Sequence, residues 1–123
     1  MDEENQPNQS EWNEQQAFSR LFFKLTESAR IFQINGAITK WAETIISKIS
    51  MVLGIADDTE KAKLKKYKDG LFFLRNQYIK SRNSTNKGKL YNLCFEVESD
   101  VDTIANKHMP FLKIRREDDI QGL

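Results

Sequence analysis

The chain of 123 residues is long enough for one domain that buries roughly two-thirds of its unfolded surface. Apolar residues make up 39% and charged residues 30%, and the net charge of +1 gives no global excess that would favour nucleic acid or an anionic membrane. The single cysteine, Cys94, excludes an internal disulfide, and no stretch approaches the roughly 20 apolar residues of a membrane-spanning helix.

The N-terminal residues 1–9 are polar and include Pro7, so they predict a flexible tail. This start is acidic and lacks the apolar segment of a signal peptide, and we therefore expect a cytoplasmic protein. Ser10 is a good N-cap for a first helix, and Asn35-Gly36 is its expected end. Between them, apolar residues recur in alternating steps of four and three, as on one face of a helix: Phe18, Phe22, Leu25, Ala29 and Phe32.

Two more helices follow in the sequence. The second keeps the same spacing from Ile38 to Val52. Asp57 or Asp58 is the predicted N-cap of the third helix. Its apolar stripe consists of Leu64, Tyr67, Leu71, Leu74 and Tyr78. Gly70 falls inside this helix, where glycine costs about 1 kcal/mol relative to alanine, and we still predict a continuous helix there.

Residues 83–89 (NSTNKGK) predict a loop because they are polar and contain glycine. A fourth helix follows, and Pro110 marks its end. Its apolar stripe consists of Leu90, Cys94, Val97, Val101, Ile104 and His108. Residues 111–123 are predicted to form a tail or a short docking segment. Four helices with short connections predict a single antiparallel all-α helical bundle over residues 10–110.

Three aromatic side chains fall outside the stripes of their helices. Phe73 lies about 200° around the third helix from Leu71, almost opposite the stripe. Phe95 lies off the stripe of the fourth helix, and Phe23 off that of the first. Several such residues on neighbouring helices suggest an interaction surface, so we predict Phe23, Phe73 and Phe95 as anchors of a protein contact.

This surplus of aromatic rings has two other interpretations. The core could be wider than two stripes, with residues 111–114 folding back over Phe72 or Phe95. Alternatively, the rings could stack on nucleic acid bases. Ten basic residues lie between positions 61 and 89 with only Asp69 as an acid among them, a mixture typical of grooves for single strands.

The alternative function is therefore a single-stranded nucleic acid or RNA backbone binding module. Its predicted contact residues are Lys63, Lys66, Phe73, Lys80, Arg82, Lys87 and Lys89. A competing interpretation is that the acids of the fourth helix neutralise the basic third helix, with each exposed pair contributing about 0 to 1 kcal/mol. These acids are Glu96, Glu98, Asp100 and Asp102.

Groups suited to catalysis are sparse. His108 lies near the C-terminal end of a helix, where the dipole favours a cation, and we predict a packed or capping role for it. Cys94 is nearly four turns away, too far for a Cys–His pair, and is predicted to be a buried apolar residue. Di-iron, phosphate-loop and zinc motifs do not occur in the sequence. We therefore predict a non-enzymatic protein with no cofactor and no metal.

The leading prediction is a helical bundle that acts through protein–protein interaction, as a homo-oligomer or a small accessory subunit of a larger assembly. A membrane-surface role is not supported, because no helix pairs a clean basic face with an uninterrupted apolar one. A small-molecule pocket lined by Trp41, Tyr67 and Tyr78 is disfavoured, because aromatic stripes at this spacing usually form core.

Overall fold

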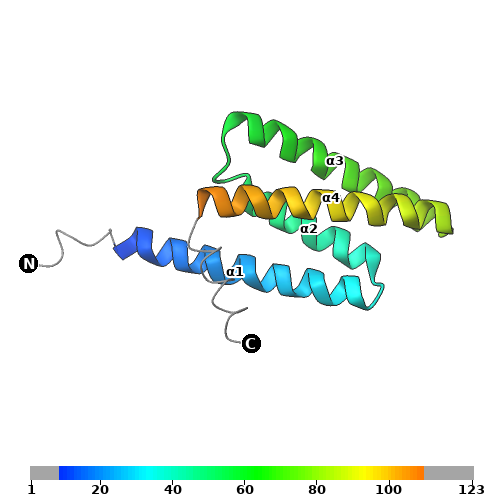
Figure 1. Cartoon of the computed structure of the whole chain (residues 1–123), viewed down its shortest axis with the longest axis horizontal. Coiled ribbons are helices and arrows are strands. Elements are labelled where there is room, and N and C mark those ends of the chain that lie inside the picture. Colours follow the sequence, from blue (N-terminus) through cyan, green and yellow to red (C-terminus); the bar gives the residue numbers. More distant parts are fainter. Residues whose placement is uncertain (1–8, 110–123) are drawn as a thin grey trace, which may run out of the picture.

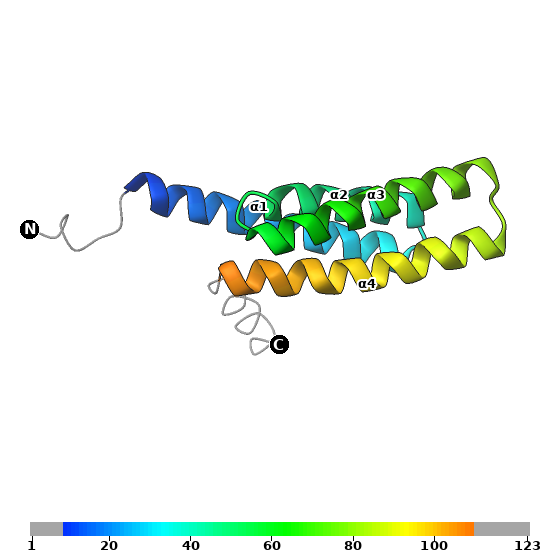
Figure 2. The same ribbon diagram turned by 90° about the horizontal axis from the view of Figure 1, so that it is seen from above.

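The computed structural model describes residues 9–109, with side chains from residue 14 onward. Residues 1–8 and 110–123, which contain most of the two predicted tails, lie outside the described part. Four helices form the fold: α1 (Gln9–Ile34), α2 (Ile38–Val52), α3 (Asp58–Lys80) and α4 (Ser84–His108). Successive helices run in opposite directions (Figures 1 and 2), and the predicted all-α antiparallel bundle is confirmed.

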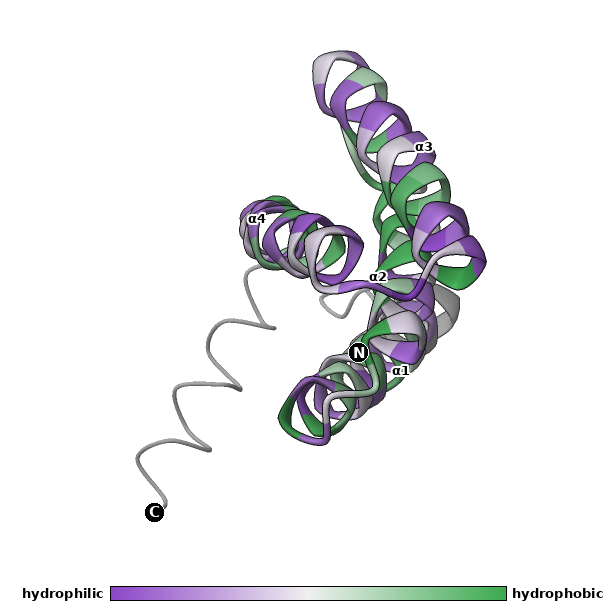
Figure 3. Ribbon diagram, turned by 90° about the vertical axis from the view of Figure 1, so that its right-hand side faces the viewer, coloured by the Kyte–Doolittle hydropathy of each residue, from purple (hydrophilic) through white to green (hydrophobic). Residues whose placement is uncertain are grey.

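The central helix is α2, which packs against each of the other three. Among the described helices, α1 contacts only α2. Viewed along the bundle, α1, α2 and α3 form a bent row, and α4 lies to one side of it against α2 and α3 (Figure 3). Because α2 and α4 run in the same direction and touch, they form the short diagonal of the bundle (Figure 1). Within residues 9–109, no backbone contact joins α1 to α4.

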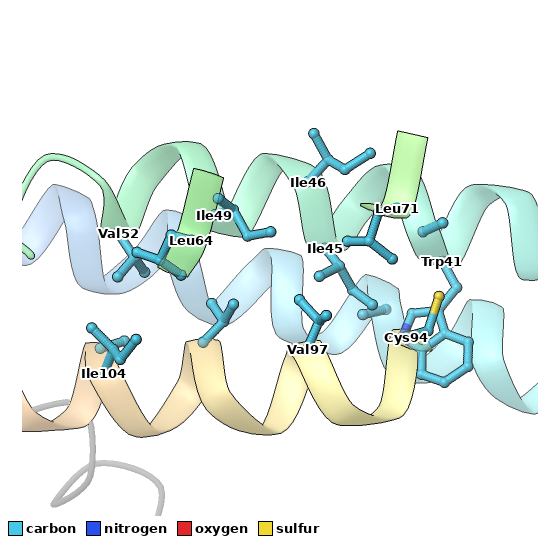
Figure 4. Packing of buried hydrophobic residues seen from close by; sticks show 14 of the residues in the cluster. Trp41, Ile45, Ile46, Ile49, Val52, Leu64, Leu71, Cys94, Val97 and Ile104 are labelled. Carbon is cyan, nitrogen blue, oxygen red and sulfur yellow. The ribbon is translucent and has the colours of Figure 1, made fainter. Parts of the chain in front are cut away.

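The core lies where the apolar stripes of α2, α3 and α4 meet (Figure 4). Its large side chains with at most 1% exposure are Trp41, Ile45, Ile49, Val52, Leu64, Leu71, Leu90, Cys94, Val97 and Val101. Helix α2 is apolar around much of its circumference, as expected for a helix with neighbours on several sides. Helix α1 contributes less, with Phe22 and Ala29 buried and Phe18 and Phe32 half-buried against the core.

Local chemistry explains how α3 begins and why it continues through its glycine. Asp57 Oδ1 accepts a hydrogen bond from the Glu60 N–H at 2.8 Å, and Glu60 Oε1 accepts one from the Asp57 N–H at 2.9 Å. This reciprocal capping box fixes the first turn. A Cβ atom at Gly70 would lie 3.4 Å from Leu93 Cδ2, so glycine here permits a close approach of α3 to α4.

Two predicted boundaries are wrong. Residues 83–89 are not a loop, because Asn83 caps α4: its side chain accepts a hydrogen bond from the Asn86 N–H at 2.8 Å. Once this cap satisfies the first turn, the polar residues that follow can occupy exposed helical positions. Helix α1 already includes Ser10, the predicted N-cap, within its first turn. Both differences lengthen a helix and leave the order of elements unchanged.

The end of α4 is tied to the start of α3 through one carboxylate. Glu60 Oε1 lies 2.6 Å from His108 Nε2, and Glu60 Oε2 accepts a hydrogen bond from Lys107 Nζ at 2.9 Å. These hydrogen bonds lower the pKa of Glu60 from 4.5 to about 2. The bond from the Asp57 N–H has the largest effect, followed by those from Lys107 and His108. His108, for which the sequence predicted a packed or capping role, contacts the Glu60 carboxylate that takes part in the capping box of α3.

We predict that Glu60→Gln lowers the free energy of unfolding at neutral pH, and that the difference from the wild type shrinks as the pH falls from 4.5 to about 2. A carboxylate with a lowered folded-state pKa stabilises the fold above its unfolded-state pKa and loses this contribution as pH falls through the folded value. Urea unfolding at a series of pH values measures the difference. Glu27→Gln, at an exposed position of α1, is the control. A difference that stays constant down to the lowest pH would contradict this assignment.

Candidate functional site

A buried ionic cluster joins α2 to α4. The Lys48 side chain is fully buried, and its Nζ lies 2.9 Å from Glu98 Oε2 and 2.8 Å from Asp102 Oδ1. Trp41 Nε1 donates a hydrogen bond to Glu98 Oε1 at 2.9 Å. Lys48 Nζ also lies 5.0 Å from the centroid of the Phe22 ring of α1, within the range of a cation–π contact. The two acids are four residues apart on α4 and so share one face of that helix.

The sequence reasoning missed this cluster and directed the acids of α4 toward α3. Only Asp100 makes an ion pair with α3 in the described part: it lies 3.1 Å from Lys63 Nζ, and it also accepts a hydrogen bond from the Tyr67 hydroxyl. The Tyr67 hydroxyl and Lys63 lower the pKa of Asp100. The sequence did contain a signal for this cluster, because Lys48 lies within the apolar stripe of α2. A lysine at a buried position needs acidic partners, so its place in the stripe predicts an ion pair. The competing interpretation, in which the acids of α4 neutralise the basic stretch, is therefore supported at Lys63 and at no other basic residue of α3 in the described part.

A surface groove runs between α1 and α4, beside the ionic cluster. It measures about 230 Å³, and its lining residues are Thr26, Arg30, Gln33, Phe95, Glu98, Ser99 and Asp102. Phe23 precedes Thr26 by three residues and Arg30 by seven, so it lies on the same face of α1. We call this feature the α1–α4 groove. Of the predicted anchors, Phe95 lines the groove from α4, and Phe23 lies on the face of α1 that also carries Thr26 and Arg30.

Phe95 has a structural contact as well as exposed surface. Its ring is 47% exposed, yet its centroid lies 5.4 Å from that of Trp41 and 5.0 Å from that of Tyr91, with the rings edge to face. The Trp41 and Tyr91 centroids are also 5.4 Å apart. Such edge-to-face contacts are favourable beyond the area they bury. Phe95 therefore helps to cover Trp41 and is less available to a partner than the sequence suggested.

The third predicted anchor, Phe73, lies on a separate surface. Its ring is 61% exposed, on the side of α3 that the helical geometry predicted. Lys66 and Lys80 lie seven residues before and after Phe73, so they share its face, and both are exposed. Phe72 and Ile79 flank this face and are 41% and 40% exposed. We call these five residues the α3 outer face.

The remaining residues predicted to bind nucleic acid lie near the connection between α3 and α4. Arg82 lies over an aromatic ring, with its guanidinium carbon 5.4 Å from the ring centroid. Lys87 and Lys89 are exposed in the first turns of α4. Of the ten basic residues between positions 61 and 89, Lys63 and Arg75 are the ones with an ion pair in the described part of the chain. Much of the predicted basic surface is therefore not neutralised by the helices around it.

The aromatic residues predicted to line a small-molecule pocket are separated. Trp41 lies in the core against α4, and Tyr67 hydrogen-bonds to Asp100. Tyr78 lies beside the turn between α1 and α2, where it lines a surface groove of about 360 Å³ together with Arg82. The three residues do not share either of the grooves described here.

The cysteine and the histidine both have structural roles. Cys94 is fully buried, and burial raises its pKa to about 12, so little thiolate forms at neutral pH. Asp57, Glu60 and His108 bring possible metal-ligand atoms within 4.8 Å of one another. The carboxylate oxygens there accept the capping hydrogen bonds of α3 and contact Lys107. We therefore assign this cluster a capping role.

No protein-family model matches the chain, and comparisons with curated proteins and with solved structures found no match. Across residues 9–109, none of the helices combines the length and apolar character needed to cross a bilayer. The function is therefore proposed from the residues of the α3 outer face and the α1–α4 groove themselves.

Proposed function

We propose that this chain is a protein-binding helical module that docks through the α3 outer face with Phe73 as its anchor. The observation that carries the proposal is a phenylalanine ring 61% exposed on the side of α3 opposite the fully buried Leu71. Burying such a ring completely is worth about 1.5 to 3 kcal/mol, and this chain leaves most of that gain to a partner.

The residues around Phe73 define the kind of partner. Phe72 and Ile79 enlarge the apolar centre, while Lys66 and Lys80 stand on the same face without an ion pair in the described part of the chain. An apolar centre with a charged rim is the usual anatomy of a protein interface. The lysines favour a partner with an acidic rim around an apolar pocket.

Charge also bears on whether the partner is a second copy. A two-fold interface through this face would bring the same patch of each copy together, lysines included. Juxtaposed like charges cost free energy, so a symmetric dimer through the α3 outer face is disfavoured. An accessory role beside a different subunit is therefore the form of the proposal that the charges support best.

We predict that Phe73→Glu removes a specific partner from material co-purified with the chain from its source cells. Because position 73 lies outside the core, the variant should keep the wild-type circular dichroism and melting temperature. Asn76→Glu is the matched control, since it adds the same charge at a nearby exposed position and keeps the ring. Mass spectrometry compares the recovered proteins, and light scattering of the wild type identifies a second copy. Equal recovery of every protein by the two variants would contradict the proposal.

Single-stranded nucleic acid is the second candidate ligand. It is favoured by the exposed ring of Phe73 between Lys66 and Lys80, and by the basic side chains near the α3–α4 connection that have no ion pair in the described part. Rings that stack on bases, beside cations that contact phosphates, are how proteins bind single strands without sequence preference.

This candidate predicts binding to a single-stranded oligonucleotide that weakens steeply as salt rises, because phosphate contacts release counterions. In a plot of log affinity against log salt, Lys80→Gln should make the negative slope shallower by about 0.7, because one phosphate contact is lost. Lys24→Gln on α1 should leave the slope unchanged. Fluorescence polarisation across a salt series measures both slopes. No binding at low salt would remove nucleic acid from consideration.

A further inference from the structure

We propose that the partner of the α3 outer face is an amphipathic α-helix of another protein, which lies along α3 and carries acidic side chains seven residues before and after an apolar residue. This inference rests on the proposed function and names the class of partner that the surface fits. The side chains that carry it all belong to α3 (Asp58–Lys80), which lies entirely within the described part of the chain.

The exposed side of α3 is long enough to receive a helix. Lys66, Phe73 and Lys80 are two turns apart and all exposed, so they form a line about 21 Å long. Among the described helices, α3 packs against α2 and α4, and it stands at one end of the bent row of α1, α2 and α3 (Figure 3). The three residues therefore lie on the side of α3 that the described helices leave uncovered.

The backbone of α3 favours a helix over an extended segment as the occupant. The N–H and C=O groups inside a helix are bonded to one another, so a strand laid on α3 would find no backbone groups to pair with. A partner helix satisfies its own backbone groups in the same way. It can pack the ridges of its side chains between those of α3.

The exposed positions of α3 recur as they do along a seam between two helices. Six exposed residues follow one another in alternating steps of four and three. They are Ala62, Lys66, Asp69, Phe73, Asn76 and Lys80. This repeat keeps two helices in contact over several turns, and the stripe around the buried Leu71 has it on the opposite side of α3. Phe73 is the aromatic residue of this exposed seam, with Phe72 and Ile79 beside it.

The charges in the seam define the composition of the partner helix. Lys66 and Lys80 have no ion pair in the described part, and each lies about 10 Å along the helix axis from Phe73. A helix that covers Phe73 with an apolar side chain therefore pairs both lysines if carboxylates stand seven residues to either side of that side chain. Asp69 is the one acid in the seam, so acidic residues outnumber basic ones on the matching face.

A second copy of this chain does not offer such a face. Nowhere in the sequence do acidic residues stand seven positions before and after an apolar residue. The densest acids are those of α4, but they occupy alternate positions and so point in different directions around that helix. The partner helix therefore belongs to a different protein.

Fluorescence polarisation with a designed peptide tests this inference on the full-length chain. The probe is an alanine- and glutamine-based helix of about 22 residues, with leucine at its centre and glutamate seven residues to either side. The labelled probe should bind the wild type saturably. A second probe with proline at two of the alanine positions cannot form the helix, and it should not bind. No saturable binding up to about 1 mM chain, or equal binding of the proline probe, would overturn the inference.

An exchange of charges is the control for the register. Lys66→Glu together with Lys80→Glu should weaken binding of the glutamate probe by on the order of tenfold. The same double variant should instead bind a probe with lysine at the two glutamate positions. The matched reversal Lys87→Glu with Lys89→Glu, at exposed positions of α4, should keep the wild-type preference for glutamate. Equal effects of the two double variants would contradict pairing along α3.

Failure of this inference can be told apart from failure of the proposed function. If Phe73→Glu removes a partner from co-purified material while the wild type binds neither probe, docking at Phe73 stands and the partner is not a helix of this composition. If the glutamate probe binds the wild type and Phe73→Glu equally well, the ring is not the anchor and both proposals fail.

Discussion

The buried ammonium group of Lys48 is the constraint on which the helix arrangement depends. Removing a cation from water costs several kcal/mol unless opposite charges replace its hydration, and Glu98 and Asp102 supply two carboxylates from a single face of α4. Because both partners lie on α4, that helix must lie beside α2. The Phe22 ring of α1 contacts the same ammonium group, so one side chain links three helices. Helices α2 and α4 are therefore in contact, whereas α1 and α4 are not in contact in the described part of the chain.

This arrangement explains why the aromatic residues that fall outside the helix stripes do not form one surface. Phe23 and Phe95 border the edge that the α2–α4 contact leaves open. Phe73 lies on α3, which does not line the α1–α4 groove, and its ring is about 200° around the helix from the fully buried Leu71. The molecule therefore has two separate surfaces of different chemistry. One is a groove with acidic residues in its α4 wall, and the other is an apolar face between lysines that have no ion pair within residues 9–109.

Much of the fold could be predicted because it rests on local signals. The apolar stripes of all four helices, the cap at Asp57 and the end of α1 at Gly36 follow from spacing and backbone preference, and Gly36 has a φ of 73°. The exposure of Phe73 follows from helical geometry alone. The partner of Lys48 and the edge-to-face contact of Phe95 with Trp41 depend on which helices become neighbours, and periodicity does not determine that. The start of α4 was missed because the capping of Asn83 outweighs the turn preference of the residues after it.

Urea unfolding of Lys48→Met tests the central role of this ammonium group most directly. The account predicts a loss of about 3 to 5 kcal/mol in the free energy of unfolding, because two carboxylates are left without their cation. The exposed Lys65→Met should lose little by comparison, and adding Glu98→Gln and Asp102→Asn to Lys48→Met should recover most of the loss. A Lys48→Met chain as stable as the wild type would contradict the account, since α4 would then not depend on the buried cation for its place.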